Sequence, residues 1–341
     1  MSKRGGGGPR RPARPPIKYI ASTPKQTRIV TRSRPEGVRW LRADGTPNWS
    51  QRVRRLPGDA KELASRPAVG IHKSAPILSA AEKIASHRVR GLVVIKGGED
   101  GVLEGILLAT DLVNYLGGGD YYQIVENRHR DSIYSALRKE VVATIMNRHP
   151  ITVYVTDDLD TILRIMVGEG VGFLPVLYDD GTLHGVITER NILGRIADMP
   201  YDKKVGDYMT STIVGVDPEA PLKEAMKSMV AHGFRRLPVI SSSTGEIKGV
   251  ITAKDIVAYF GRHEAFKNAQ SGRLSEAISI PVYMVMSPEV YTIDEKASVA
   301  DAARRMLELG VDSLIVVDGG EARGIITERD VLVASIVEGE G

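Results

Sequence analysis

The chain contains no cysteine, aromatic residues make up only 5% of it, and its apolar runs are short. The absence of cysteine excludes disulfides, thiolate catalysis and cysteine-ligated zinc or iron–sulfur sites. It also fits a reducing compartment, so we expect the protein in the cytoplasm. No apolar run approaches the roughly 18 residues that a membrane-spanning helix needs. The basic N-terminus is not followed by an apolar core, so it does not resemble a signal peptide.

Catalytic motifs are missing as well. The sequence has no Walker loop, no GxSxG and no GxGxxG, and no two of its seven histidines flank a glutamate at helical spacing. The Glu–Arg pairs in TER (188–190) and TERD (327–330) are typical of solvated helix starts. We therefore expect neither an enzyme nor a metal site.

Charge divides the chain into a basic arm and an acidic body. Residues 1–58 contain twelve Arg and three Lys against Glu36 and Asp44, which gives a net charge of +13. Because the whole chain carries +4, residues 59–341 carry −9. Any function has to account for both parts.

The body repeats one pattern four times. Each copy has a short apolar run, a turn, and a second run that begins with glycine, which is the pattern of a β-hairpin. The first runs are LVVI (92–95), LPVL (174–177), LPVI (237–240) and LIVV (314–317), and the second are GILLATD (105–111), GVITERN (185–191), GVITAKD (249–255) and GIITERD (324–330). Apolar residues at helical spacing precede each hairpin and predict an amphipathic helix that packs on the sheet.

The expected unit is strand, helix, strand, strand, helix, about 60 residues long, and too small to bury its apolar face alone. The predicted N-caps are Asp157 or Asp158 in repeat two, Asp217 in repeat three and Asp294 in repeat four. Longer helical inserts near 112–140 and 256–280 are expected to join the two halves of one module.

At these residues the body resembles four tandem CBS domains. The shared marks are a Met-containing lead segment, a hydrophobic-Pro-Val strand and a Gly-hydrophobic-x-Thr-x-x-Asp run. The resemblance implies an α/β fold in which β-α-β-β-α units form two Bateman modules behind an extended basic arm. The expected divisions are 1–58 (arm), 59–140 (CBS 1 with linker helices), 141–199 (CBS 2), 200–270 (CBS 3 with a linker helix) and 271–341 (CBS 4).

The resemblance also implies adenosine ligands such as AMP, ADP or ATP, with no obligatory cofactor. A carboxylate can accept both ribose hydroxyls, and a Thr hydroxyl can bind a ribose or phosphate oxygen. The free N–H groups of the following helix and a nearby Arg or Lys favour phosphate.

Repeat three fits these roles best, and repeat one fits them least, because Leu108 replaces the Thr there despite Asp111. Asp312 opposes a phosphate in repeat four. The candidate residues are Arg235, Arg236, Thr252, Lys254 and Asp255 in repeat three, Thr327, Arg329 and Asp330 in repeat four, and Thr188, Arg190 and Asn191 in repeat two. The alternative is that Thr and Asp only cap their own helices and that the repeats are structural.

The arm is rich in Pro, and its Arg outnumber its Lys four to one. Alone it should be largely disordered. Guanidinium groups bind phosphate bidentately and stack on bases, and aromatic side chains among them offer stacking surfaces. The candidate RNA-binding residues are Arg4, Arg10, Arg11, Arg14, Lys18, Tyr19, Arg28, Arg32, Arg34, Arg39, Trp40, Arg42, Trp49, Arg52, Arg54 and Arg55.

Two other roles of the arm stay open: a solubilising tail, and contact with an anionic membrane surface, which the lack of an amphipathic helix disfavours.

As a whole architecture, the chain resembles the archaeal CBS-domain ribosome hibernation factors. The resemblance implies an arm that inserts into ribosomal RNA and a body that docks on the ribosome and senses adenine nucleotides. The alternative is a free-standing energy sensor that regulates a protein partner, with a homodimer as the candidate free form. A DNA-binding regulator is a third hypothesis, although no helix-turn-helix is evident.

Overall fold

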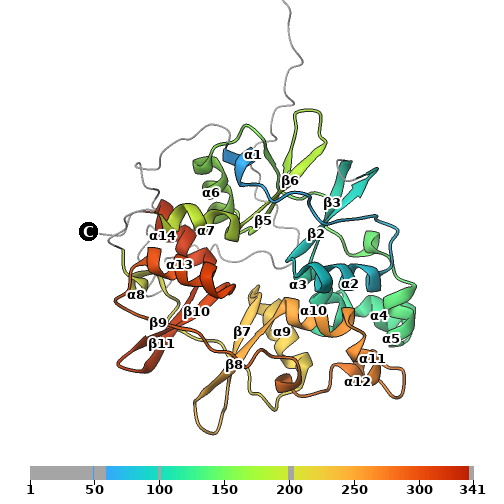
Figure 1. Cartoon of the computed structure of the whole chain (residues 1–341). Helices are drawn as coiled ribbons and strands as arrows, with labels where there is room; N and C mark the ends of the chain where they lie inside the picture. Colours follow the sequence, from blue (N-terminus) through green and yellow to red (C-terminus); the bar gives the residue numbers. More distant parts are fainter. Residues whose placement is uncertain (1–48, 50–58, 99–100, 199–202, 338–341) are drawn as a thin grey trace, which may run out of the picture.

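The four repeats predicted from the sequence are present and form a ring (Figure 1). The computed structural model describes residues 49, 59–98, 101–198 and 203–337. A short helix, α1 (Asp59–Leu63), precedes repeat one. The predicted α/β class with four CBS-type units is confirmed, and three of the units have the full strand-helix-strand-strand-helix order. In repeat three a single parallel bridge between Val216 and Val239 takes the place of the first strand.

The strands and helices fall into the same order in each repeat, except that repeat three lacks the first strand. Repeat one contains β1 (Gly70–Ile71), α2 (Ile77–His87), β2 (Gly91–Lys96), β3 (Val102–Leu108) and α3 (Ala109–Val113), which continues as a π-helical turn (Asn114–Gly118). Repeat two contains β4 (Val153–Tyr154), α6 (Leu159–Gly168), β5 (Phe173–Leu177), β6 (Leu183–Thr188) and α7 (Glu189–Ala197). Repeat three contains α9 (Leu222–His232), β7 (Arg236–Ile240), β8 (Ile247–Thr252) and α10 (Ala253–Gly261). Repeat four contains β9 (Thr292–Asp294), α13 (Val299–Leu309), β10 (Ser313–Asp318), β11 (Glu321–Thr327) and α14 (Glu328–Ile336).

The predicted helix starts are right in repeat two and wrong in repeats three and four. Asp158 caps α6 and accepts a hydrogen bond of 2.9 Å from the Thr161 amide. The N-cap of α9 is Pro221, and that of α13 is Ser298. Asp217 and Asp294 instead accept hydrogen bonds within the preceding turns, from the backbone amides of Glu219 and Lys296. An Asp close to a helix can stabilise a turn as well as a cap, and the sequence does not distinguish the two.

Within each module the two repeats exchange their lead segments. The segment before β1 pairs with β6 through Ser65 and Val186, and the segment after repeat one pairs with β3 through Asn147 and Ile106. The second module repeats both contacts, as Thr210 with Ile325 and Ser287 with Val250. The lead segments include short helical turns at Val142–Thr144, Val205–Tyr208 (α8) and Val282–Met284.

This exchange explains the glycine that opens each second hairpin run. The backbone of the exchanged segment passes directly over it, so a side chain has no room. A Cβ at Gly324 would lie 2.6 Å from the Thr210 carbonyl oxygen, and one at Gly185 would lie 2.8 Å from that of Ser65. The same close approach occurs at Gly105 and Gly249.

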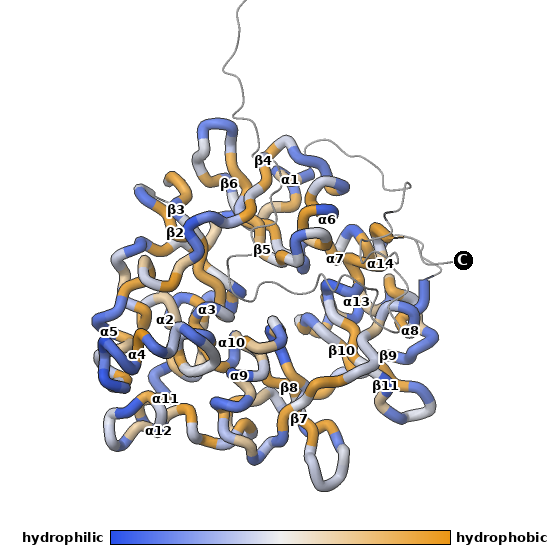
Figure 2. Tube along the Cα trace, turned by 180° about the vertical axis from the view of Figure 1, so that it is seen from behind, coloured by the Kyte–Doolittle hydropathy of each residue, from blue (hydrophilic) through white to orange (hydrophobic). Residues whose placement is uncertain are grey.

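Apolar cores and the exchanged segments between repeats three and four close the ring in the order one, two, four, three. Repeats one and three share one core, in which α2 packs on α10, and repeats two and four share another, in which α7 packs on α13 and α14. Sheet residues of repeats one and two form a third cluster. In Figure 2 the strands are mostly orange, and the turns and insert loops at the rim are mostly blue or white.

The helical inserts connect the two repeats of each module along the chain, as expected, and they also pack on each other across the two modules. They are α4 (Tyr122–His129), α5 (Ile133–Arg138), α11 (Glu264–Lys267) and α12 (Leu274–Ala277). Asp131 accepts hydrogen bonds from the Tyr122 hydroxyl at 2.8 Å and from the Ser275 amide at 3.0 Å. Among the described residues, no helix is long and apolar enough to cross a bilayer.

The exchanged backbone predicts a stability difference between two glycine variants. We expect Gly324→Ala to lower the free energy of unfolding by about 1–3 kcal/mol, because its methyl group overpacks against the Thr210 carbonyl. Gly194→Ala is the control, since Gly194 lies in α7 with open space around its Cα. Alanine there should raise stability by about 0.5–1 kcal/mol. Urea unfolding measures both, and equal effects would contradict the role of the exchange.

Candidate functional site

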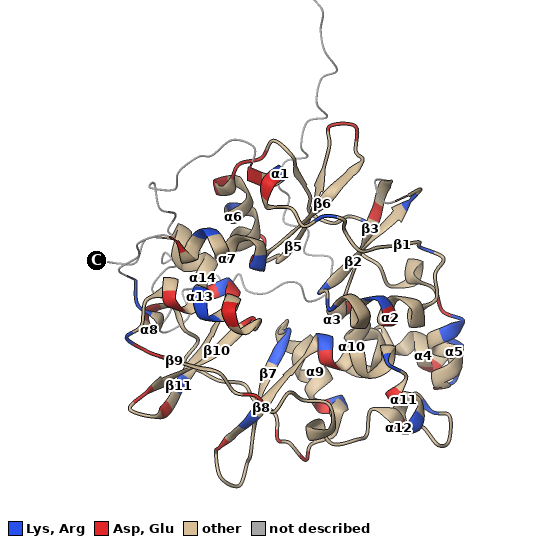
Figure 3. Ribbon diagram, in the orientation of Figure 1, with Lys and Arg blue, Asp and Glu red and all other residues tan. Residues whose placement is uncertain are grey.

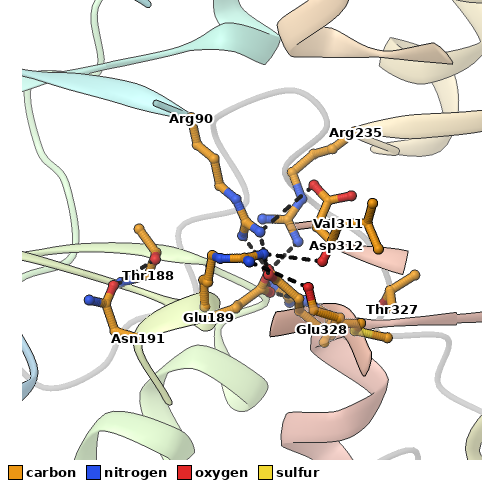
Figure 4. A network of polar contacts seen from close by, with 12 residues as sticks. Arg90, Thr188, Glu189, Asn191, Arg235, Val311, Asp312, Thr327 and Glu328 are labelled. Carbon is orange, nitrogen blue, oxygen red and sulfur yellow. Dashed lines mark hydrogen bonds and ion pairs between the residues drawn. The ribbon is translucent and has the colours of Figure 1, made fainter. Parts of the chain in front are cut away.

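A network of buried ion pairs occupies the middle of the ring (Figure 4). Its centre is Glu189, the first residue of α7, whose side chain is 1% exposed. Glu189 binds Arg90 at 2.9 Å, Arg235 at 2.5 Å and Arg329 at 2.8 Å. Burial alone would raise the pKa of Glu189, but the guanidiniums of Arg235, Arg329 and Arg90 hold it well below its usual range. The carboxylate is therefore ionised at neutral pH.

A second set of pairs lies beside the first. Arg90 also contacts the buried carboxylate of Glu328, the first residue of α14, and lies 3.8 Å from Asp312. Arg236 binds Asp312 at 2.9 Å. Burial opposes ionisation of Asp312, yet Arg236, Arg90 and Lys254 lower its pKa to about 2. Burial and the neighbouring Arg235 lower the pKa of Arg90 to about 10, which still leaves it charged at neutral pH.

The repeat architecture brings these side chains together. Arg90, Arg235 and Asp312 each stand two residues before the leading Leu of a hairpin, at the start of β2, β7 and β10. Glu189 and Glu328 follow the Thr that ends the second hairpin strand. Because both positions lie at the inner end of a repeat, the ring directs them to its centre, where the charged segments meet in Figure 3.

The sequence interpretation missed three of these residues. Arg90 was not a candidate, and the Glu–Arg pairs were expected to be solvated, whereas Glu189 and Glu328 have no exposed surface. The prediction is wrong because a helix start is solvated only when no other repeat covers it. Aligning the four repeats could have singled out the two glutamates. The first residue of the last helix is Glu in repeats two and four, and it is Ala109 or Ala253 in repeats one and three.

The centre carries more positive than negative charge. Five carboxylates (Glu189, Glu328 and Asp312, with Asp255 and Asp330 at the edge) face six cations, which are Arg90, Arg190, Arg235, Arg236, Arg329 and Lys254. Burial lowers the pKa of Lys254. The side chain of Arg236 is 7% exposed, and its Nε atom has no hydrogen-bond partner. A buried donor without an acceptor beside surplus cations is an environment that favours an anion.

The predicted Thr–Asp pairs of repeats three and four form capping boxes at the edge of this centre. The Thr252 hydroxyl donates to Asp255 Oδ2 at 2.6 Å, and that of Thr327 donates to Asp330 at 2.8 Å. The predicted capping role is therefore confirmed. Burial raises the pKa of Asp255, and it raises that of Asp330 to about 6. Carboxyl groups kept in an unfavourable environment are typical of functional sites, although structural networks also contain them.

Repeats one and two differ from this pattern. Asn191 uses both ends of its amide within the protein, since Oδ1 accepts from the Thr188 hydroxyl at 2.7 Å and Nδ2 donates to Ser65 at 2.8 Å. Arg190 donates to the Val311 and Met306 carbonyls at the end of α13, so it serves as a helix cap as well as a central charge.

In repeat one, Asp111 accepts a hydrogen bond of 2.8 Å from the Leu108 amide, and burial raises its pKa to about 7.

Only one candidate residue of the arm is described. The ring of Trp49 packs against the core shared by repeats two and four, lies 5.1 Å from the Arg164 guanidinium, and its backbone bridges to Val337. The body thus holds the indole, and its stacking on RNA bases stays a prediction. The other candidates, from Arg4 to Arg55, lie outside the described residues. Within the described ranges, no group of three or more His, Asp or Glu could hold a metal ion.

Comparison with known proteins agrees with this architecture. The family model of the CBS domain matches residues 60–118, 142–198, 205–262 and 282–336. The chain belongs to the CBS-domain family. Proteins of this family are typically regulatory rather than catalytic.

Three similarities extend over most of the chain. It is 32% identical to the "uncharacterized 33.4 kDa protein in ribosomal RNA operon" of Thermofilum pendens, over 78% of this chain and 87% of that one. It is 30% identical to the uncharacterized protein MJ1225 of Methanocaldococcus jannaschii, over 80% and 96%. The crystal structure of MJ1225, proposed as an archaeal homologue of γ-AMPK, superimposes with a TM-score of 0.74 over 80% of this chain and 97% of that one. A Pyrococcus horikoshii structure at 19% identity (TM-score 0.50, covering 82% and 98%) shares the fold.

The opposite pKa directions of two capping carboxylates predict opposite pH effects. The folded-state pKa of Asp330 is raised to about 6, above the unfolded value near 4, so ionisation costs stability as pH rises through this window. Asp330→Asn should therefore gain stability relative to wild type between pH 4 and pH 7. Asn191 shows that an amide fits this position.

Asp301 is the matched control, because it forms the same capping box with Ser298. The Ser298 hydroxyl and Arg304 lower the pKa of Asp301, so its ionised form stabilises the fold above about pH 4. Asp301→Asn should lose stability relative to wild type over the same range. Thermal unfolding at several pH values measures how the stability of each variant, relative to wild type, changes with pH. A change of the same sign for both variants would contradict the opposite pKa directions of Asp330 and Asp301.

Proposed function

We propose that the chain is an adenine-nucleotide sensor whose phosphate-binding centre is the middle of the ring. The observation that carries the proposal is the surplus of cations at the centre of the ring, together with the unpartnered Nε of Arg236. An anion at this point would pair with the surplus charge and accept from the free donor.

Adenosine is the expected remainder of the ligand for two reasons. Asp255 and Asp330 lie at the rim of the centre, each on the first turn of a helix, where a carboxylate can accept two ribose hydroxyls. The similarity to MJ1225, itself proposed as an archaeal homologue of γ-AMPK, points to the same class. Repeats three and four are the proposed ribose sites, with Thr252 and Thr327 beside them.

The proposal predicts which variants lose the nucleotide. Asp255→Asn and Asp330→Asn keep an acceptor for the Thr hydroxyl but remove the charge that the ribose hydroxyls prefer. We expect at least one of them to weaken ATP, ADP or AMP binding about tenfold or more, since a hydrogen bond to a charged group contributes about 1.5–3 kcal/mol. Calorimetry measures the affinity, with Asp301→Asn as a control that should bind as wild type does. Equal affinities for all four proteins would exclude both ribose sites.

Ribosomal RNA binding by the arm is the second proposal. The name of the Thermofilum pendens relative places that protein in a ribosomal RNA operon, and the arm has the Arg-rich composition that suits RNA. Trp49 itself packs on the core of repeats two and four, so this aromatic candidate is held by the body. Inhibition of idle ribosomes is the more specific form of this proposal, and it follows from the resemblance of the architecture alone.

Deletion of residues 1–48 tests the RNA proposal while it keeps Trp49 and the described body. If about eight arm cations contact single-stranded phosphates, the logarithm of the affinity should fall with the logarithm of salt with a slope of about −6. The deleted protein should lose most of this slope and unfold at an unchanged temperature. Filter binding to ribosomal RNA at several salt concentrations measures it, and unchanged binding by the deleted protein would refute the role of the arm.

A further inference from the structure

Two buried glutamates stand where a ligand phosphate would be most strongly attracted. Glu189 and Glu328 are the first residues of α7 and α14, at the positive end of each helix dipole. Neither has exposed surface, and together they contact four guanidiniums. A cation that is paired with one anion attracts a second anion less, so these carboxylates and a phosphate would compete for the same groups.

The other two repeats lack this feature. Alanine occupies the equivalent position in α3 and α10, as Ala109 and Ala253. The internal anions therefore belong to repeats two and four, whereas repeats one and three supply Arg90 and Arg235. This alternation gives each glutamate a partner from a neighbouring repeat. It does not arise from the Asp or Asn that accepts the N-cap amide, because all four repeats have that residue.

We propose that Glu189 and Glu328 are internal competitors of the ligand, and that a bound phosphate takes Arg235 and Arg329 away from Glu189. This inference rests on the proposed nucleotide site. Glu189 is the more exchangeable of the two, because Arg235 and Arg329 keep 31% and 29% of their side chains exposed and can turn toward a ligand. Arg90, at 14% exposed, is shared with Glu328 and stays in place.

Displacement has a consequence for protons. Glu189 would then keep Arg90 as its one cation, and Glu328 and Asp312 also interact with this arginine. Asp330, on the far side of Arg329, adds a further negative charge nearby. Lys254 faces Asp312 and adds little to Glu189. A buried carboxylate that loses two of its three cations binds a proton more readily. Phosphate binding should therefore take up a proton from solvent at mildly acidic pH.

The competitor also sets ligand selectivity. Adenosine carries no phosphate, so it cannot displace Glu189 and should bind without this proton uptake. Inorganic pyrophosphate carries the charge without the nucleoside, and it should compete with the carboxylate on its own. Glu189 therefore lowers the affinity for phosphorylated ligands relative to adenosine. The effect grows with the strength of its ion pairs to Arg235 and Arg329.

The test is calorimetry of the full chain with ATP, pyrophosphate and adenosine at pH 6, in two buffers of different ionisation enthalpy. We expect Glu189→Gln to bind ATP and pyrophosphate about tenfold more tightly than wild type and adenosine equally well. Proton uptake on ATP binding should be smaller in the variant than in wild type. ATP also exchanges protons of its own, but this contribution is the same for both proteins and drops out when the two are subtracted. Glu62→Gln, which removes an exposed carboxylate paired with Arg195, is the charge-matched control and should behave as wild type.

The outcomes separate this inference from the proposed function. In one outcome, wild type binds ATP, and the folded Glu189→Gln variant binds it no more tightly and takes up as many protons. Glu189 would then serve only as a structural partner of its arginines, and the inference alone would be overturned. The absence of heat with every ligand would refute the nucleotide site and the inference together. If Glu189→Gln does not fold, Glu328→Gln is measured in its place, and unchanged affinity and proton uptake there would equally overturn the proposal.

Discussion

A carboxylate without exposed surface is stable only when cations reach it, and Glu189 draws its cations from the whole ring. The glutamate belongs to repeat two, and its partners Arg90, Arg235 and Arg329 belong to repeats one, three and four. Removing one partner of a buried pair typically costs about 3–5 kcal/mol, because the remaining charge stays desolvated. The mutual position of the four repeats is thus tied to the electrostatics of one side chain, and any ligand that enters the centre acts on all of them.

The repeats share a fold but have diverged into complementary pairs. Repeats one and three supply Arg before the first hairpin strand and Ala after the second, and repeats two and four supply Glu after the second. The exchanged lead segments and the glycines beneath them are the same in both modules, because the close backbone approach tolerates no side chain. Packing positions were therefore kept, while the positions that face the centre changed in a way that balances most of the charge and leaves a cationic surplus.

The arm and the body meet at a defined place. Trp49 lies against the core of repeats two and four and under the Arg164 guanidinium, and Val337, next to α14, pairs with it. The same helix begins at Glu328 in the centre. One helix of nine residues thus extends from the proposed ligand site to Val337, the residue that pairs with Trp49.

The sequence by itself determined the repeats, because apolar periodicity and hairpin glycines depend only on neighbours along the chain. It also determined the capping pairs Thr252–Asp255 and Thr327–Asp330, since both partners lie within one turn. Only the tertiary structure decided that Arg90, Glu189 and Glu328 meet, that the inserts pack across the modules, and that Asp217 stabilises a turn instead of a helix. The physical reason is that burial and charge pairing at these positions come from other repeats, and the distance along the chain carries no information about which repeats become neighbours.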